Sequence, residues 1–450
     1  MTYVPHTDKE RADMLAAIGV ERIEDLFCDV PKRARFPKLT LPRALSEMEV
    51  AVEMRALAAR NADLQRHDCF LGAGTYNHFV PSTVDYVLQR SEFYTAYTPY
   101  QPEASQGMLQ AMFEYQSMIC RLTGMEVSNA SHYDGATSLA EAVLLALNAT
   151  EGKRTKVIVS PAVHPQYRQV MTTYLQGMEA RIVGEEDATR GVDALAALLD
   201  AETAALVVQN PDFFGQIDEL KDLADAVHMA GALLVVLADP IALGLFRPPG
   251  DDGADIVVAD GQPLGLPPSF GGPHVGIFAT RKAYVRRLVG RVVGETVDAD
   301  SERGYVLTLG TREQHIRRAR ATSNICTNAA LGALAAAVYL ATLGKHGLKQ
   351  IAELCYHKSH YAAAEIAKIP GISINPQKPN KPFFKEFVVE IPKPVAQANE
   401  ILLGEFGIVG GYDLGQDESR LENHMLVAVT EMNTRASIDR LVEALQRAVA

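Results

Sequence analysis

Short apolar runs alternate with amphipathic segments through the middle of the chain, and this alternation constrains the fold more than any other feature. From about residue 105 the expected helices and strands take turns, and strands such as KVIVS, AALVVQ and ALLVVLAD are continuous in Val, Leu, Ile and Ala. Continuous apolar strands are buried on both faces, which is typical of a mainly parallel sheet covered by helices. We therefore predict an α/β fold in which the loops after the strand carboxyl ends share one functional edge.

Helical segments precede this sheet, and a smaller mixed region follows it. The segment LPRALSEMEVAVEMRALAARN places apolar residues on roughly one helical stripe, at Leu45, Met48, Val52 and Leu57. With two shorter helical segments before it, this stripe predicts a helical N-terminal arm over residues 1–65. After residue 345, strands such as HMLVAVTEM are mixed with helices such as RASIDRLVEALQRAVA. We predict a large α/β domain over residues 66–345 and a small α+β C-terminal domain over residues 346–450.

The charge balance narrows the possible partners. The 450 residues contain 43 Lys and Arg against 55 Asp and Glu, which gives a formal net charge of −12. Because an acidic chain repels phosphate backbones, we expect no nucleic-acid partner. The most basic stretch, REQHIRRARATSN from Arg312, is interpreted as a solvated helix face that could also form a local anion site.

Neither secretion nor membrane insertion is indicated. The N-terminal residues lack the apolar core of a signal peptide, and the longest apolar run, residues 329–344, suits a buried helix better than a membrane span. The five cysteines are scattered and show no C-x-x-C spacing, which is typical of reduced thiols in a cytoplasmic protein. Cys355, His357 and His360 have helical spacing; we interpret them as a helix surface and expect no metal site.

Three candidate positions fall where the strand ends should meet. Gly135 and Thr137 lie at the expected start of a helix, where backbone N–H groups suit a phosphate, although Asp134 or Thr137 could be an ordinary helix cap. His164 follows the strand KVIVS and could stack on a flat cofactor or bond to the backbone. Asp239 ends the strand ALLVVLAD, where it could hold a pyridinium nitrogen protonated or form an Asp-Pro turn.

The order of these positions indicates a cofactor cradle more strongly than any one of them. A glycine loop at a helix N-terminus, then a strand-end His, a strand-end Asp and a polar turn is the order found in fold-type-I enzymes that use pyridoxal phosphate (PLP). In the turn ADGQPLG, Gln262 stands where the Schiff-base lysine belongs. Because an amide cannot form an imine, the chain has the cradle without the covalent anchor.

An aromatic loop lies outside this cradle. The segment FYTAYTPYQPEASQG, residues 93–107, contains four aromatic residues and two prolines and resembles neither a strand nor a helix. It could pack on its own protein. If it is exposed, it would offer hydroxyl groups and ring faces to a neighbouring subunit.

Three long strings carry a family resemblance. YTAYTPYQPEASQG, GGPHVGIFATR and TREQHIRRARATSNICTNAAL closely resemble the P-protein, or glycine decarboxylase, of the glycine cleavage system. The similarity covers essentially the whole chain, and it is to the N-terminal half of the long form, which is a separate first subunit in many bacteria. The second half carries the Schiff-base lysine in this family, so the resemblance implies that Gln262 is expected here.

The resemblance also implies a reaction and partners. P-proteins decarboxylate glycine on PLP and transfer the aminomethyl group to the lipoyl arm of the H-protein. The implied assembly is α2β2, with PLP held by the second subunit and not bound covalently to this chain. We expect this subunit to supply loops that close the partner's site and position the lipoyl arm.

Two segments are our candidates for that contribution. The aromatic loop is expected to reach the partner's site through Tyr94, Tyr97, Thr98, Tyr100 and Gln101. The turn Thr322-Ser323-Asn324 is the second candidate, as a phosphate or cofactor contact across the interface. Two other hypotheses remain: a catalytically silent scaffold that stabilises its partner or docks the H-protein, and an autonomous enzyme that uses Lys221 or Lys282, neither of which lies at a suitable turn.

Overall fold

The computed structural model describes residues 5–185 and 191–450. The chain forms two compact units, of which the first ends at Ala62 and the second spans Asp63–Ala450. The domain boundary that we predict near residue 345 divides this second unit and stays a prediction.

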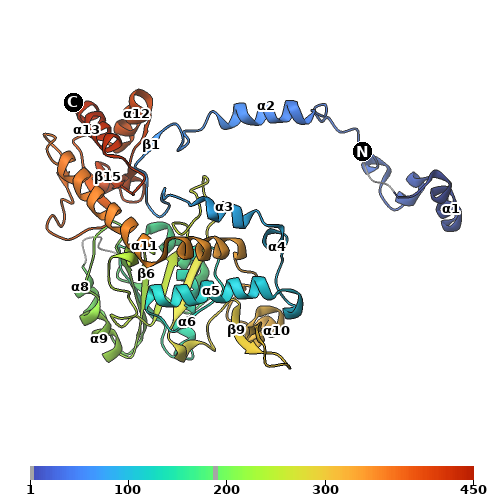
Figure 1. Cartoon of the computed structure of the whole chain (residues 1–450), viewed down its shortest axis with the longest axis horizontal. Coiled ribbons are helices and arrows are strands. Elements are labelled where there is room, and N and C mark those ends of the chain that lie inside the picture. Colours follow the sequence, from blue (N-terminus) through green and yellow to red (C-terminus); the bar gives the residue numbers. More distant parts are fainter. Residues whose placement is uncertain (1–4, 186–190) are drawn as a thin grey trace. The chain divides into compact units, whose positions relative to one another are not determined.

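A seven-stranded sheet forms the centre of the second unit, in the order β2-β8-β7-β6-β5-β3-β4 (Figure 1). The strands are β2 (Val127–Ser128), β3 (Lys156–Val159), β4 (Arg181–Val183), β5 (Thr203–Asn210), β6 (Leu233–Ala238), β7 (Ile256–Asp260) and β8 (Gly276–Thr280). Pairing is parallel from β4 through β7, whereas β8 runs antiparallel to both of its neighbours. The sheet is therefore mainly parallel, as the apolar runs predict.

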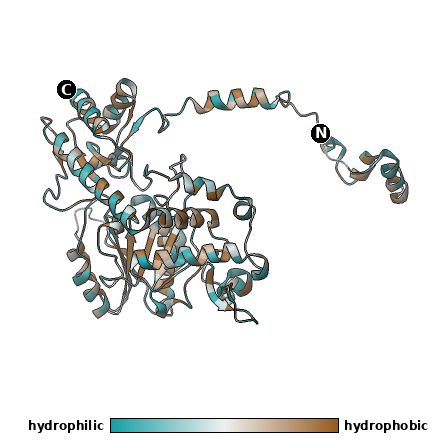
Figure 2. Ribbon diagram, in the orientation of Figure 1, coloured by the Kyte–Doolittle hydropathy of each residue, from teal (hydrophilic) through white to brown (hydrophobic). Residues whose placement is uncertain are grey.

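Helices cover both faces of this sheet, because its apolar strands present side chains to two separate cores (Figure 2). One core lies under α5 (Gln106–Thr123), α9 (Lys221–Met229) and the first part of α11 (Ala330–Ile366). The other lies under α6 (Gly135–Ala149) and α7 (Pro165–Leu175). Burial on both faces explains why the strands are continuous in apolar residues.

Helix α11 leads from the sheet into the C-terminal part of the chain. It has 37 residues and is interrupted at Gly344, whose φ of 58° is left-handed. By length and composition it is the one helix among the described residues that could cross a membrane, but buried residues such as Leu334 and Tyr339 pack it into the core. The apolar run over residues 329–344 is therefore a core helix, as expected.

A four-stranded antiparallel sheet follows, in the order β11-β12-β15-β14. Its strands are β11 (Ser373–Ile374), β12 (Glu386–Glu390), β14 (Tyr412–Asp413) and β15 (His424–Ala428). Helices α12 (Val395–Phe406) and α13 (Arg435–Val449) pack on it through a core of their own. The chain enters this region early, since β1 (Asp68–Cys69) pairs with β13 (Ile408–Val409).

The remaining hairpin, β9 (Val292–Val297) with β10 (Arg303–Thr308), is antiparallel and leads into the short helix α10 (Gln314–Arg317). Helix α10 is flanked by the 3-10 turns Gly310–Arg312 and Arg318–Arg320, so the segment from Arg312 is helical in short pieces and does not form one continuous helix. Residues 315–320 are exposed, as the predicted solvated face requires. Helix α10 ends before Arg318, whose φ of 53° is not helical.

The N-terminal unit contains α1 (Asp8–Ile18) and α2 (Glu47–Ala58). Both helices begin with a reciprocal capping box, formed by Thr7 with Glu10 and by Ser46 with Glu49. None of residues 5–62 is buried, and Met48 and Val52 of the predicted stripe are 75% and 62% exposed. Within its own unit, the arm therefore has helices but no core.

Candidate functional site

The predicted cradle positions meet at the carboxyl ends of the parallel strands. His164 caps α7 after β3, Asp239 follows β6, and Gln262 follows β7. His164 and Asp239 line a cavity of only about 40 Å³ together with Tyr76, Tyr167 and Glu386, and Gln262 lies outside its lining. The strand order therefore brings together the residues that the sequence singles out, but the space between them is nearly filled.

The N-terminus of α6 already holds a carboxylate. Gly135 N–H donates to Asp260 Oδ2 at 3.1 Å, and His274 Nδ1 lies 2.9 Å from the same oxygen. The hydrogen bond with Asp260 raises the pKa of His274. A Cβ at Gly135 would come within 2.9 Å of the Asp260 backbone nitrogen, so only glycine fits this approach. Asp260 thus takes the position that suits a phosphate.

The same helix start has an ordinary cap, as the alternative interpretation allows. Asp134 is the N-cap residue, and its Oδ1 accepts a hydrogen bond of 2.8 Å from the Thr137 backbone N–H. The Thr137 hydroxyl donates to the Asp134 carbonyl at 3.1 Å. Thr137 therefore stabilises the helix end and has its hydroxyl proton engaged within the turn.

His164 has a stacking partner from its own chain. Its ring lies 4.6 Å from the Tyr167 ring at an interplanar angle of 21°, and Phe213 lies 4.7 Å away. Its Nε2 atom is 2.9 Å from the Ala73 carbonyl, and burial lowers its pKa. The histidine is thus bonded to the backbone and packed against aromatic rings, and Tyr167 occupies one stacking face.

The cation that pairs with Asp239 is a lysine of the same chain, at the place where a cofactor's pyridinium nitrogen is expected. Lys385 Nζ forms an ion pair with Asp239 Oδ2 and lies 3.3 Å from the centroid of the Tyr76 ring. Burial alone would raise the pKa of Asp239, but the Lys385 charge and hydrogen bond hold that pKa below its ordinary value. Asp239 Oδ1 also accepts from Ile241 N–H at 2.8 Å, as in the Asp-Pro turn that we consider.

Gln262 is fully buried, and both the oxygen and the nitrogen of its side-chain amide form hydrogen bonds. Its Oε1 accepts from the Tyr76 N–H at 2.9 Å, and its Nε2 donates to the Tyr76 carbonyl at 2.9 Å and to the Leu266 carbonyl at 2.7 Å. The side chain therefore holds the Tyr76 segment across the cradle.

In this structure the chain's own side chains occupy the positions in the cradle that PLP would need. The phosphate position is taken by Asp260, the stacking face by Tyr167, and the pyridinium position by Lys385. Small-molecule sites usually have about 300–1,000 Å³, far more than this cavity offers. Sequence reasoning misses all three residues, and only Asp260, two positions before Gln262, gave a signal that could have been used.

The aromatic loop, in contrast, is open. Tyr94, Tyr97 and Tyr100 are 54%, 74% and 58% exposed, and Gln101 is also exposed. Thr98 is half-buried, and its carbonyl accepts from the Tyr100 N–H at 2.9 Å. The loop therefore presents three phenol rings to its surroundings while its backbone is held in place.

Buried Arg291 connects this loop to the second predicted segment. Its Nη2 donates to the Tyr100 hydroxyl at 3.0 Å, and its Nη1 donates to the Cys326 carbonyl. The guanidinium group lies 5.3 Å from the centroid of the Tyr100 ring. Residues 93–107 and 322–326 are thus neighbours in space, although about 220 positions separate them. Sequence reasoning gave no sign of Arg291.

The turn at 322–324 is fixed through its middle residue. Ser323 Oγ donates to Glu141 Oε1 at 2.6 Å and accepts from the Ile325 N–H at 3.0 Å. Glu141 lies on α6, and burial raises its pKa to about 7. Thr322 and Asn324 on either side are exposed. Of the three predicted contacts, Ser323 therefore supports the turn, and its two neighbours face outward.

Comparison with known proteins decides the family. Residues 1–445 match the family model described as glycine cleavage system P-protein. The chain belongs to the P-protein family. It is 53% identical to the probable glycine dehydrogenase (decarboxylating) subunit 1 of Thermomicrobium roseum, with both chains fully covered. It is 52% identical to the protein of the same name from Geobacillus kaustophilus, over 98% of each chain.

Solved structures agree with this assignment. A crystal structure of glycine decarboxylase (P-protein) of the glycine cleavage system, in inhibitor-bound form, matches this P-protein family chain with a TM-score of 0.89 and 46% identity over the full length of both. Glutamate decarboxylase from Lactobacillus brevis matches with a TM-score of 0.68 at 15% identity, over 93% of this chain and 95% of that one. The second likeness shows the fold alone.

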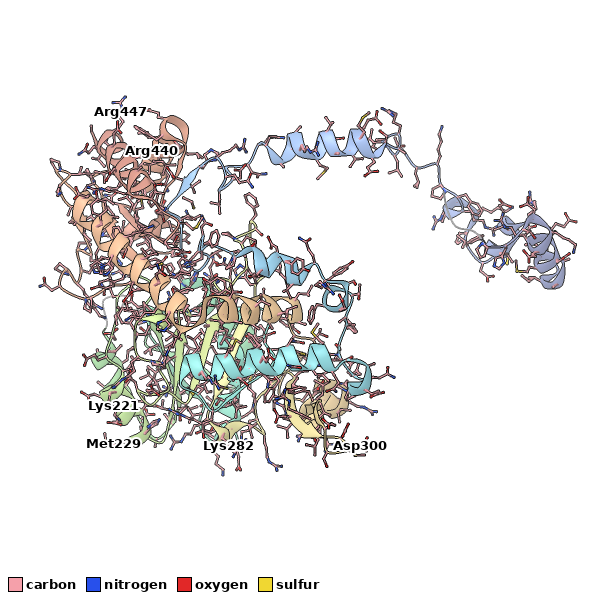
Figure 3. All side chains as sticks on the ribbon, in the orientation of Figure 1. Lys221, Met229, Lys282, Asp300, Arg440 and Arg447 are labelled. Carbon is pink, nitrogen blue, oxygen red and sulfur yellow. The ribbon has the colours of Figure 1, made fainter. Side chains whose placement is uncertain are left out.

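The two lysines considered for an autonomous P-protein enzyme lie outside the cradle. Lys221 begins α9 and pairs with Asp225 at 2.7 Å, and Lys282 is exposed after β8 (Figure 3). Lys385, which the sequence gave no reason to consider, is the lysine that reaches the cradle. Its pairing with Asp239 makes it a structural cation there.

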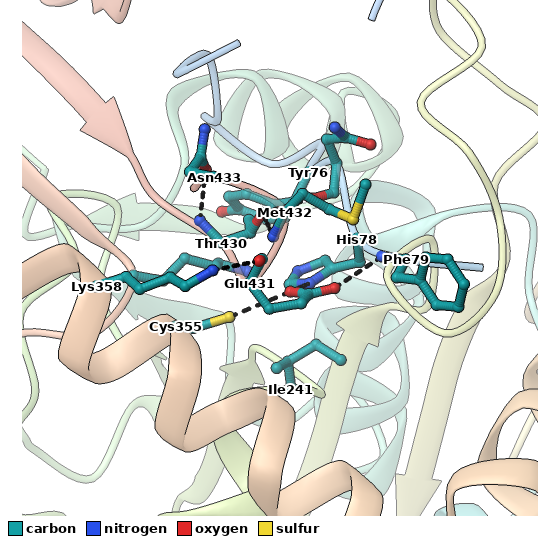
Figure 4. Close-up of polar contacts among 12 residues, drawn as sticks. Tyr76, His78, Phe79, Ile241, Cys355, Lys358, Thr430, Glu431, Met432 and Asn433 are labelled. Atoms are coloured by element: carbon teal, nitrogen blue, oxygen red, sulfur yellow. Dashed lines mark hydrogen bonds and ion pairs between the residues drawn. The ribbon is translucent and has the colours of Figure 1, made fainter. Parts of the chain in front are cut away.

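A buried cluster in this P-protein family chain corrects one sequence interpretation. Cys355 is fully buried, so assigning it to a helix surface is wrong. Its thiol lies 3.5 Å from Glu431 Oε2, which His78 Nδ1 approaches at 2.7 Å (Figure 4). Burial raises the pKa of Cys355. His78, Cys355 and Glu431 are side chains of types that bind metals, and here they form hydrogen bonds with one another. The cluster joins helix α11 to the segments around residues 78 and 431.

Proposed function

We propose that this chain is the non-PLP subunit of a two-subunit glycine decarboxylase, or glycine dehydrogenase (aminomethyl-transferring), of the glycine cleavage system. One observation carries the proposal: the cradle is filled by the chain's own side chains, in a protein whose full-length relatives are named subunit 1. A chain with this cradle needs a second subunit to provide a cofactor site.

In this proposal the second subunit holds PLP, and the two form an α2β2 heterotetramer in the cytoplasm. PLP supplies the electron sink for glycine decarboxylation when it is bound there. The aminomethyl group then passes to the lipoyl arm of the H-protein. This chain contributes the exposed surface around the aromatic loop, which closes the partner's site and limits access of water.

The exposed side chains of that loop have distinct expected roles. Tyr94, Tyr97 and Gln101 are the groups free to reach a neighbouring subunit, while Tyr100 is oriented by Arg291. Thr98 supports the loop backbone. Thr322 and Asn324 flank the same surface and are proposed as cofactor or phosphate contacts across the interface, with Ser323 as the positioning residue.

The test is to prepare this chain alone, its second subunit alone, and the pair. We expect PLP absorbance and glycine–bicarbonate exchange only where the second subunit is present, and full exchange only in the pair. Borohydride treatment with PLP should give no stoichiometric label at any lysine of this chain, including Lys385. Stoichiometric pyridoxyl-lysine at any position of this chain would overturn the proposal.

The alternative function is a silent scaffold that stabilises its partner or docks the H-protein. The N-terminal unit favours a role in assembly, because none of residues 5–62 is buried. The two functions differ in one result: substitutions in the exposed aromatic loop change turnover without changing assembly only if the loop serves the reaction.

A further inference from the structure

Five arginine side chains surround one open hollow on the unit formed by residues 63–450. The hollow has a volume of about 460 Å³ and lies among the end of α6, the segment after β8 and the segment around α10. Its cationic residues are Arg286, Arg287, Arg312, Arg317 and Arg320. Thr322 lies on its rim side by side with them, and Leu288 and Val289 give it an apolar part.

These guanidinium groups form no ion pair among the described residues, and the one carboxylate whose charge acts on them is that of Glu313, beside Arg312. No carboxylate of residues 5–185 or 191–450 forms an ion pair with any of the five. The nearest acid in sequence, Glu313, directs its Oε2 toward Arg291 at 3.9 Å and His315 at 3.5 Å. Since the chain as a whole carries a net charge of −12, the positive hollow is a local feature and not part of a basic surface.

Backbone carbonyl groups hold several of these side chains in place. Arg312 donates from Nε to the Leu309 carbonyl and from Nη2 to the Gly290 carbonyl, both at 3.0 Å. Its Nη1 is buried and has no hydrogen-bond partner among the described residues. Arg287 is anchored in the same way on the Asn148 carbonyl. The arginines are therefore oriented by neutral groups, and their remaining N–H donors are available to an anion.

We propose that this hollow binds a compact polyanion with two or more phosphate groups, taken from solution. A guanidinium fork matches the oxygens of a phosphate, and several forks around one space require several negative charges close together. The volume falls within the range of about 300–1,000 Å³ that is usual for small-molecule sites. This site lies outside the cradle and the aromatic loop, and it shares Thr322 with the turn that we propose to face the second subunit.

Inorganic pyrophosphate is the probe. Calorimetric titration of the full chain should give saturable binding at one site, and the affinity should fall as KCl is raised, because salt screens exposed charges. Arg317→Gln with Arg320→Gln should weaken binding at least tenfold. Both side chains are exposed, so the double variant is expected to fold as the wild type does. Arg317→Lys with Arg320→Lys, which keeps the charge and loses the forks, should fall between the two.

Arg435→Gln is the matched control, because Arg435 is an exposed arginine on α13 and its ion pair with Asp439, at 3.8 Å, is loose. It should bind pyrophosphate as the wild type does. Three results would overturn the proposal: no saturable binding, equal binding by the double Gln variant, or citrate binding as tightly as pyrophosphate. Loss of pyrophosphate binding in the assembled pair would also overturn it, because the hollow would then be a subunit contact.

Discussion

The cradle and the aromatic loop both contain polar and aromatic side chains, but these are bonded within the chain in the cradle and exposed in the loop. In the cradle, Gly135, His164, Asp239 and Gln262 each bond to a group of their own chain. At the aromatic loop, Tyr94 and Tyr97 are more than half exposed. The difference teaches that the same fold can keep the positions of a cofactor site while its own side chains fill that site, and leave polar aromatic side chains exposed elsewhere.

The largest expected effect comes from opening the cradle with Lys385→Met. The substitution leaves the Asp239 carboxylate buried without its cation, and breaking a buried pair in this way costs about 3–5 kcal/mol. The measurement is the free energy of unfolding in urea. Lys221→Met, which removes an exposed pair with Asp225, is the control and should cost no more than about 1 kcal/mol.

Adding Asp239→Asn to Lys385→Met should recover part of the loss, because the buried negative charge is removed as well. Wild-type stability in the single Lys385→Met variant would show that the ion pair with Asp239 does not stabilise the cradle. The cradle would then not differ from the aromatic loop in the way described.

A smaller effect is expected from Glu141, which ties the 322–324 turn to α6. Burial raises its pKa to about 7, so the folded state holds a proton that the unfolded state releases near pH 4.5. The resulting stability is present below the unfolded pKa and is lost as pH rises through the folded pKa. The loss is about 3 kcal/mol, at 1.36 kcal/mol for each pKa unit.

Glu141→Gln keeps a side-chain acceptor for Ser323 and removes the titration. The difference in unfolding free energy between the wild type and this variant, measured from pH 4 to pH 8, should change in favour of the variant as pH rises. Parallel curves across this range would contradict the assignment of a buried, protonated Glu141.

Tyr100→Phe tests the internal anchor of the aromatic loop. It removes the hydroxyl that accepts from Arg291, and a hydrogen bond to a charged group contributes about 1.5–3 kcal/mol. We expect that loss in unfolding free energy, together with lower turnover of the assembled pair, because the loop is less well placed. Co-purification of the two subunits should be retained. If both stability and turnover are unchanged, the hydrogen bond from Arg291 to Tyr100 does not hold the aromatic loop in place.

Tyr97→Phe should have the smallest effect on the stability of this chain, and its effect on turnover of the assembled subunits is the most informative. Tyr97 is 74% exposed, so its hydroxyl should add nothing measurable to the stability of this chain. If it bonds a neutral group across the interface, its loss costs about 0.5–1.5 kcal/mol, or up to about tenfold in turnover. Normal assembly with normal turnover would favour the scaffold function.

Much of the fold follows from patterns that are local in sequence. Continuous apolar strands predict the parallel sheet, and the order of Gly135, His164, Asp239 and Gln262 predicts that they meet. Their actual partners could not be predicted in the same way. Lys385 lies 146 positions beyond Asp239 in a segment that reads as an ordinary strand, and only the packing of the two sheets brings them together.

Cys355 is wrongly assigned to a helix surface, and the sequence itself contains a pattern that argues against this assignment. Residues 355, 357 and 360 do not lie on one face of a helix, since each residue advances by about 100°. Ala352, Ser359 and Ala362 are buried with Cys355, at spacings of three, four and seven. That stripe of small residues indicates the inward face of α11, and the two histidines lie beside it.

The N-terminal arm has a consequence for how the chain behaves in a cell. Its two helices have 11 and 12 residues, lengths at which a helix without external contacts is only marginally stable in water. With no buried residue over positions 5–62, the arm keeps its shape only while something covers it. An uncovered arm would therefore be cut by proteases before the folded unit of residues 63–450.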